Sequence, residues 1–270
     1  MPAVNSIQAG SATAAIARAS SRTGVDFDYL IAQARIESGL NPQARATTSS
    51  ARGLYQFVDQ TWLRTIDRHG GKHGLAWAQD AVHGGRVTDA ALRGEIMALR
   101  DDPDASALMA AELALDNREG LRARLGREPD HAELYLAHFL GLGGAQEFLA
   151  ALAGDPGQLA QGVNPAAARA NRAIFFEGSR PRSVGEVMEV IRGKMSAAAG
   201  AAPAGGPPPL APAAFAATRG SRQALPDGGA AEPMSMADTL RSTFGDGSGL
   251  GGRAGARVAA AYSAFKAFAL

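Results

Sequence analysis

The sequence contains no cysteine, which excludes disulfide bonds, thiolate zinc sites and a cysteine nucleophile. Charge of one sign is not in excess either, because 27 Lys and Arg residues face 26 Asp and Glu residues and leave a formal net charge of +1. A general nucleic-acid-binding protein needs a concentrated basic face, so we expect no nucleic-acid partner. No run approaches the roughly 18 apolar residues that a membrane helix needs, which predicts no membrane span.

Composition divides the chain into three parts. Residues 1–195 contain many capped segments of helical periodicity and no convincing strand alternation, which predicts an all-α domain. Residues 196–233 are rich in Ala, Pro and Gly and cannot bury enough area to offset their ordering entropy, so we expect a disordered linker. Residues 234–270 form a C-terminal segment. Its last part, 256–270, has apolar residues at helical spacing and is either an amphipathic helix for a protein partner or a loosely ordered tail.

Capping residues and glycines predict where the helices of the first part begin and end. A first, Ala-rich helix is expected over residues 5–22, packed against the second helix. Later helices are expected to begin at the following N-caps: Asp26, Asp59 or Thr61, Thr88, Asp102, Asp130, Asn164 and Ser183. Glycines at 39, 70–71 and 141–144 are expected to end three of them, and a short separate helix is expected over residues 146–152.

The stretch from residue 30 to residue 57 carries the most information about function. At about 100° per residue, Leu30, Ala34 and Glu37 fall on one stripe of the helix that Gly39 ends. A carboxylate on the apolar face of its own helix resists ionisation because desolvation disfavours the charged form. A general acid that works near neutral pH needs this property. Glu37 is therefore a candidate catalytic acid.

A structural role for Glu37 is the alternative. The side chain sits at a helix end, where it could rotate into solvent or pair with Arg35 or Arg45. The segments that follow favour the catalytic interpretation. Residues 37–42 read ESGLNP, and residues 49–57 read SSARGLYQF. In this order, and separated by a short polar loop, they resemble the first two motifs of the soluble lytic transglycosylases.

The resemblance extends over about residues 23–176 and implies both a fold and a reaction. It implies a goose-type-lysozyme-like, all-helical catalytic domain acting on peptidoglycan glycan strands. Glu37 would protonate the oxygen between N-acetylmuramic acid and N-acetylglucosamine, and the substrate's own acetamido group would stabilise C1. The deprotonated Glu37 would then help the C6 hydroxyl attack, leaving a 1,6-anhydro end. One carboxylate used twice suffices, and no cofactor or metal is implied.

Several residues of the two motifs are candidates for substrate binding. Ser38 could bond near the acetamido group or hold the helix end, and Gly53 would let the backbone approach a sugar closely. Gln56 offers both a donor and an acceptor in the Gly-Leu-Tyr-Gln turn that lines the sugar groove of the family. Tyr55 could stack on a sugar face, although Tyr55 and Phe57 could equally be core residues.

The third motif of the family, Ala-Tyr-Asn, is altered in this chain. Ala137 keeps the alanine, but His138 stands in place of the tyrosine that contacts the catalytic glutamate, and Phe139 replaces the asparagine. Tyr135 and His138 are three residues apart on one helical face, so either could reach Glu37. His138 could also be an ordinary core histidine.

Other polar groups give weaker signals. His69 and His73 have a metal-like spacing, but the two glycines between them indicate a loop, so we expect no metal site. The Gly-rich run near residue 250 follows no strand and is no phosphate loop. The Asp101–Asp102 pair is better explained by helix capping.

Two other functions remain open. A hydrolytic muramidase on the same scaffold would need a second carboxylate, for which Asp59 or Asp67 could be offered. A non-catalytic cell-wall-binding scaffold is the other, disfavoured by the intact Glu37, Gly53 and Gln56. The N-terminal residues lack the basic and continuous apolar segments of a standard signal peptide, so we expect a cell-wall-facing protein whose export route is not visible.

Overall fold

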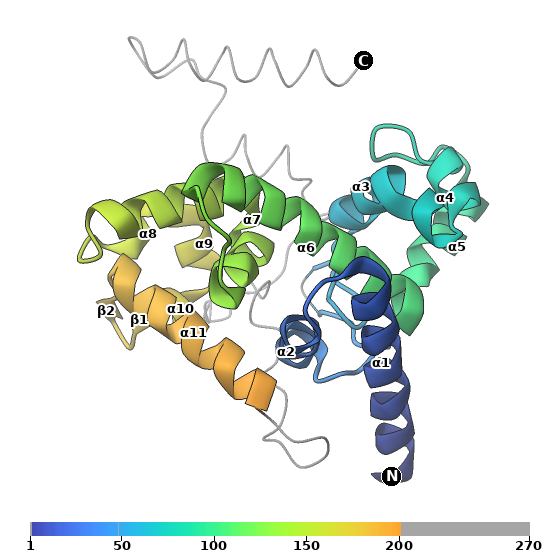
Figure 1. The fold of residues 1–270 in the computed structure, drawn as a ribbon, viewed down its shortest axis with the longest axis horizontal. Coiled ribbons are helices and arrows are strands. Elements are labelled where there is room, and N and C mark those ends of the chain that lie inside the picture. Colours follow the sequence, from blue (N-terminus) through green and yellow to red (C-terminus); the bar gives the residue numbers. More distant parts are fainter. Residues whose placement is uncertain (1, 48, 201–270) are drawn as a thin grey trace, which may run out of the picture. The chain divides into compact units, whose positions relative to one another are not determined.

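The computed structural model describes residues 2–47 and 49–200, which form a helical domain with one very short hairpin (Figure 1). This architecture confirms the all-α expectation. The predicted C-terminal segment 234–270, its helix 256–270 and the linker beyond residue 200 lie outside the described residues.

The helices follow one another with short connections. Three long helices, α1 (Pro2–Thr23), α6 (Pro103–Leu125) and α7 (His131–Gly154), are joined by the shorter α2 (Phe27–Ser38), α3 (Asp59–His69), α4 (Ala76–Ala81) and α5 (Ala90–Ala98). Then come α8 (Ala160–Val163), α9 (Pro165–Ala170), α10 (Arg172–Phe175) and α11 (Val184–Gly200). Two 3-10 turns, η1 (Gly70–His73) and η2 (Leu99–Asp101), follow α3 and α5. Strands β1 (Phe176–Glu177) and β2 (Arg180–Pro181) pair antiparallel before α11.

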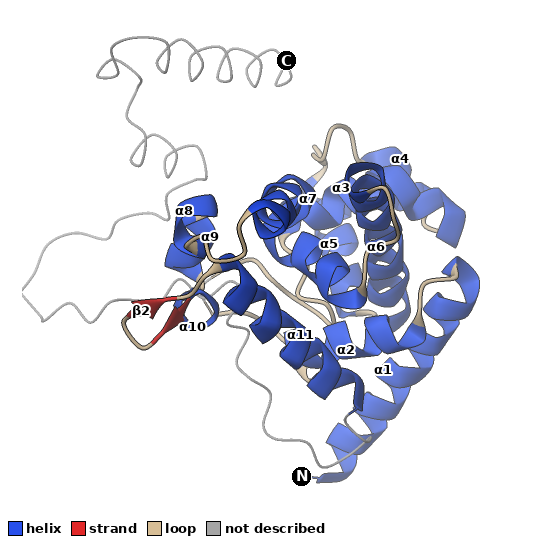
Figure 2. Ribbon diagram, turned by 60° about the vertical axis from the view of Figure 1, so that its left-hand side comes forward, coloured by secondary structure: helices blue, strands red, loops and turns tan. Residues whose placement is uncertain are grey.

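Helix α2 lies between α1 and α11, as both ribbon views show (Figures 1 and 2). The Asp26 side chain accepts from the Tyr29 backbone N–H at 3.0 Å, and Gly39 ends the helix with a left-handed φ of 61°. Both boundaries agree with the sequence-based prediction. Helices α3, α4 and α5 gather on one side of the domain, and α8, α9 and the hairpin lie on the other.

Most of the predicted N-caps are confirmed. Asp102 and Asn164 each accept from a backbone N–H of the first turn, and Asp130 forms a reciprocal capping box with Glu133, as Ser183 does with Glu186. Two predictions were wrong by a few residues at most. Helix α3 begins after Val58, which offers no side-chain cap, and Asp89 rather than Thr88 caps α5.

Two helices differ in length from the prediction. The helix that starts at His131 does not end at the glycines 141–144 but continues to Gly154, with a kink at Gly141 (φ 74°, ψ 158°). Glycine tolerates this conformation, so the chain turns there without ending the helix. The helix expected after Asn164 is instead divided into α9 and α10 at Asn171.

Helix α7 is also the one described helix that is long and apolar enough to cross a membrane, which the search for apolar runs had not predicted. It contains the Gly141 kink, and buried side chains such as Leu136 and Phe148 pack it among α6 and α11. These contacts are those of a core helix in a folded domain.

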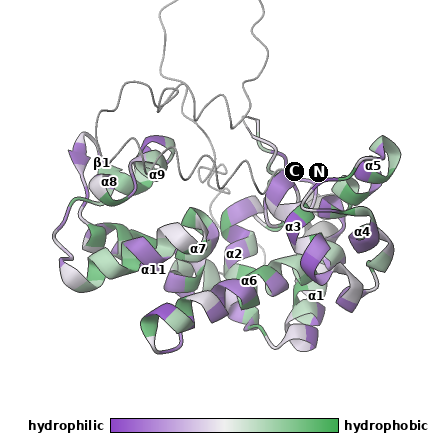
Figure 3. Cartoon of the chain, turned by 90° about the horizontal axis from the view of Figure 1, so that it is seen from above, coloured by the Kyte–Doolittle hydropathy of each residue, from purple (hydrophilic) through white to green (hydrophobic). Residues whose placement is uncertain are grey.

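Helix α11 packs against α2, the helix that carries Glu37. It also packs against α7, and it continues five residues past the domain boundary expected at residue 195. The Arg35 guanidinium donates to the carbonyls of Ala198 (2.6 Å) and Ala199 (3.3 Å), two acceptors at the C-terminal end of α11 that lack helical partners. Hydrophobic and hydrophilic residues alternate around α11, as expected of a helix with one buried face (Figure 3). Helix α1 packs mainly against α6 and also touches α2.

Candidate active site

Glu37 lies in the last turn of α2 and is only 1% exposed. The structural alternatives for this side chain do not apply. It does not point into solvent, Arg35 is bound to the end of α11, and the described partner of Arg45 is Asp101, at 3.7 Å. The carboxylate is therefore held inside the domain without a pairing arginine.

Two side chains of α7 approach the same oxygen of this carboxylate. The Tyr135 hydroxyl donates to Glu37 Oε1 at 3.1 Å, and His138 Nε2 lies 3.4 Å from the same atom, without the geometry of a hydrogen bond. Burial and the adjacent Glu37 raise the pKa of Tyr135 well above its usual value of 10, so the hydroxyl keeps the proton it donates. Glu37 Oε2 has no hydrogen-bond partner among the described residues. The structure thus brings together Glu37, Tyr135 and His138.

Ser38 joins the end of α2 to the Gly-Leu-Tyr-Gln turn. Its hydroxyl is 2.7 Å from the Leu54 carbonyl and 3.1 Å from the Ala34 carbonyl of its own helix. A hydroxyl has one proton, so the shorter contact to Leu54 is the stronger candidate for its hydrogen bond. Of the two roles considered for Ser38, this geometry matches holding the helix end.

The turn itself, residues 53–56, depends on two residues with positive φ. Gly53 has φ 83°, and a Cβ at this position would overlap the carbonyl oxygen of Arg100. The glycine therefore allows a close approach to protein backbone, and the expected approach to a sugar is not its reason. Gln56 has φ 48°, a conformation rare for a side-chain-bearing residue. Its amide nitrogen donates to the carbonyls of Gly53 (2.8 Å) and Ala44 (3.2 Å), which leaves its Oε1 without a partner among the described residues.

Tyr55 is placed differently from the stacking role considered for it. Its ring is fully buried, and its hydroxyl donates to the Leu30 carbonyl on α2 at 3.2 Å. The ring cannot stack on a sugar in this position, because it is completely enclosed in the hydrophobic core. Tyr55 and Phe57 are both core residues, the alternative that the sequence left open.

A cavity of about 270 Å³ opens beside this group, between α3, α6 and α7. His138, which approaches Glu37, lines the cavity together with Gln56 and with Gly141 at the kink of α7. Glu37 is not on the cavity surface but lies directly behind His138. The arrangement is a cavity with a buried carboxylate close to one of its lining residues and with the side-chain amides of Gln56 and Asn117 in its wall.

Sequence reasoning missed the residues that support the turn. Arg100 is buried and donates to the carbonyls of Ser50 and Phe57 and to Asp59 Oδ1, all near 3 Å. Arg52 pairs with Asp101, the neighbour of the capping Asp102. A cationic side chain in a short 3-10 turn carries no periodic signal, so only the three-dimensional contacts reveal it.

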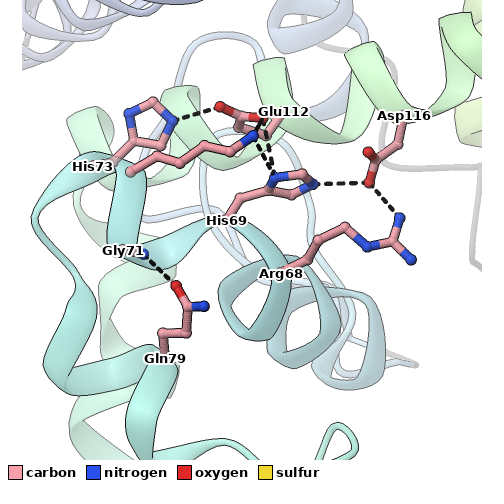
Figure 4. Close-up of polar contacts among 8 residues, drawn as sticks. Arg68, His69, Gly71, His73, Gln79, Glu112 and Asp116 are labelled. Carbon is pink, nitrogen blue, oxygen red and sulfur yellow. Dashed lines mark hydrogen bonds and ion pairs between the residues drawn. The ribbon is translucent and has the colours of Figure 1, made fainter.

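His69 and His73 take part in a polar cluster that joins α3 and η1 to α6 (Figure 4). His73 Nε2 contacts Glu112 Oε1 at 2.7 Å, and His69 Nε2 contacts Asp116 Oδ2 at 2.9 Å. Lys72 lies 3.1 Å from both Glu112 Oε2 and His69 Nδ1. With the proton of each histidine assigned to Nε2, each of these contacts pairs a donor with an acceptor. The cluster is structural, and both histidines are already bound to carboxylates.

Comparison with protein families gives one match to this chain. Residues 14–82 match the family model described as the Transglycosylase SLT domain. The matched segment includes the C-terminal part of α1, all of α2 and α3, and the turn at residues 53–56. Tyr135 and His138 lie beyond it.

Proposed function

We propose that this chain is a lytic transglycosylase that cleaves peptidoglycan glycan strands, because residues 14–82 match the family model described as the Transglycosylase SLT domain. Cleavage of cell-wall glycan is the role that the family supports directly. The finer proposal is that the β-1,4 bond between N-acetylmuramic acid and N-acetylglucosamine breaks without water and leaves a 1,6-anhydro end.

Glu37 is the proposed acid and base of this reaction. It gives its proton to the bridging oxygen as the bond from C1 to that oxygen breaks, and the acetamido carbonyl oxygen of the same sugar bonds to C1. The Glu37 carboxylate then takes the proton of the C6 hydroxyl while O6 bonds to C1 and displaces the acetamido oxygen. The acid is regenerated, and no water is consumed.

The observation that carries this proposal is the unequal surroundings of the two Glu37 oxygens. Tyr135 holds Oε1, whereas Oε2 is buried and has no partner among the described residues. A proton on Oε2 would have no competing acceptor among the described residues. Low exposure also keeps bulk water from the carboxylate, and this favours attack by the C6 hydroxyl over attack by water.

The surroundings of the other carboxylates near the cavity favour a reaction that uses Glu37 alone over hydrolysis with a second carboxylate. Asp59 is bound by Arg100 at 2.9 Å and by Arg93 at 3.1 Å, and Asp67 does not line the cavity. Asp116 lines it but is held by Arg68 and His69. A muramidase would need a free second carboxylate to activate water. None of these three groups matches that need.

The test compares the wild type with Glu37→Gln on purified sacculi, with product masses read by mass spectrometry. The wild type should release fragments with anhydro ends, which are one water lighter than reducing ends. The amide cannot donate the acid proton, so turnover should fall by about 10²- to 10⁴-fold, with sacculus binding unchanged. Glu119→Gln, exposed on α6, is the control. Reducing ends would assign a muramidase, and full activity of Glu37→Gln would reject Glu37 as the acid.

Three expectations accompany this function as proposals. The substrate places the working site of the chain at the cell wall. The catalytic domain is proposed to comprise residues 1–195 together with the remaining turn of α11. The segment 256–270 is proposed to bind a protein partner.

A further inference from the structure

The wall of the cavity formed by α3 carries an unpaired positive charge. Thr61, Arg64, Thr65 and Arg68 line the cavity from one face of this helix. Arg68 is paired with Asp116 at 2.8 Å, so its charge is compensated. Arg64 is exposed and has neither an ion pair nor a hydrogen bond with any described residue. The wall therefore presents one free guanidinium, with its planar donors available to an anion.

The opposite wall, formed by α6, carries an unpartnered amide. Asn117 is only 6% exposed, yet it lines the cavity and its side chain makes no hydrogen bond with the described residues. The oxygen and nitrogen of this amide are not among the fully buried atoms that lack a partner, so they are open to the cavity and available to a ligand. An amide group in a ligand can form hydrogen bonds with the Asn117 side chain, because each of the two amides has both a donor and an acceptor. Leu113 and Leu142 add apolar side chains to the lining of the same cavity.

We propose that this cavity binds the peptide stem of the glycan strand, with Arg64 paired to a stem carboxylate and Asn117 bound to a stem peptide bond. This inference rests on the proposed function and adds the part of the substrate that the cavity selects. The stem supplies both chemistries in one ligand, since its backbone is a series of amides and its side chain and terminus carry carboxylates. The sugars supply acetamido groups but no carboxylate once the lactyl group is joined to the stem.

The experiment measures kcat/KM of Arg64→Gln and of the wild type on three substrates. These are stem-bearing strands, the same strands with stem carboxylates converted to amides, and strands stripped of stems, which expose the lactyl carboxylate. Arg64→Gln should be about three- to tenfold slower on the first substrate, the range of one solvent-accessible ion pair in a cleft. It should match the wild type on the other two. Arg118→Gln, exposed on α6 and outside the cavity, should match the wild type on all three.

If Arg64→Gln lowers kcat/KM on stripped strands, the partner of Arg64 is the lactyl carboxylate. If it lowers kcat/KM equally on all three substrates, the role of Arg64 does not depend on a stem carboxylate. Either result overturns the proposal, as does no loss at all. Asn117→Ala, checked for folding by thermal unfolding, should be slowed on both stem-bearing substrates and not on stripped strands. Calorimetric binding of soluble stem-bearing fragments reports on Arg64 without cleavage. If no substrate is cleaved but binding weakens in Arg64→Gln, the proposed function fails and the stem site stands.

Discussion

The Glu37 carboxylate has one oxygen contacted by two side chains of α7 and one oxygen without a partner among the described residues. Tyr135 supplies a neutral donor that cannot take up the acid proton, because its own pKa is raised well above 10 by burial and by Glu37. The hydroxyl holds one oxygen of the carboxylate at 3.1 Å. In the proposed reaction it would stabilise the carboxylate after proton transfer, and we therefore propose Tyr135 as a positioning residue for Glu37.

At the residue scale, Tyr135→Phe should lower kcat about tenfold with little change in KM, since one hydrogen bond to a charged group contributes about 1.5 kcal/mol or more. Steady-state kinetics on solubilised glycan strands measures both constants. Tyr55→Phe is the matched control, because it also removes a buried hydroxyl, but one that is bound to the Leu30 carbonyl. If the two variants lose kcat equally, the effect of Tyr135 is on folding and not on the acid.

At the scale of the elements, the sequence predicted the helix of Glu37 well, because its limits are set locally. Asp26 and Gly39 are capping residues whose preferences do not depend on the rest of the fold. Helical spacing also placed Tyr135 and His138 on one face. It could not say which of them reaches Glu37, and in the structure both approach the same oxygen.

The cavity could not be predicted in this way. Arg64 and Asn117 belong to helices separated by two shorter helices and two 3-10 turns, and neither lies in a motif. Only the packing of α3, α6 and α7 brings them to one space. The same holds for Gly53, which packs against the backbone carbonyl of Arg100. The sequence could not predict this contact, because the two residues are far apart in the chain.

The turn at residues 53–56 provides the prediction at this scale. Gly53→Ala meets both an unfavourable φ and an overlap with the Arg100 carbonyl. Gly74→Ala is a close control, since Gly74 has φ 80° but no atom near its would-be Cβ. We expect the control to lose about 1–2 kcal/mol of unfolding free energy, and Gly53→Ala to lose clearly more and also to lose activity as Gln56 moves. Thermal unfolding and the sacculus assay measure the two effects, and equal losses of stability would show that the overlap is relieved.

At the scale of the whole molecule, the cluster around Glu112 links the α3 and η1 region to the long helix α6. Burial raises the pKa of Glu112, but the hydrogen bonds from His73 and Lys72 and the nearby His69 outweigh it and leave the pKa below its usual 4.5. A carboxyl group with a lowered folded-state pKa stabilises the fold above its unfolded pKa. That stabilisation disappears as the pH falls through the folded-state value.

Glu112→Gln should therefore lower the free energy of unfolding by about 2–4 kcal/mol at pH 7, because it removes the charged acceptor of several buried hydrogen bonds. The difference from the wild type should shrink as the pH is lowered from about 5 toward 3. Urea unfolding at a series of pH values measures it, with the exposed Glu119→Gln as reference. A difference that stays constant over this range would mean that the Glu112 charge does not stabilise the fold.

The hydrogen bond between Tyr135 and Glu37 spans 98 positions of the chain. An emerging or unravelled polypeptide has the acid but not the helix that aims it, so the complete reactive centre appears only after α7 has docked onto α2. If the proposed function holds, cleavage of glycan strands would therefore require the folded domain.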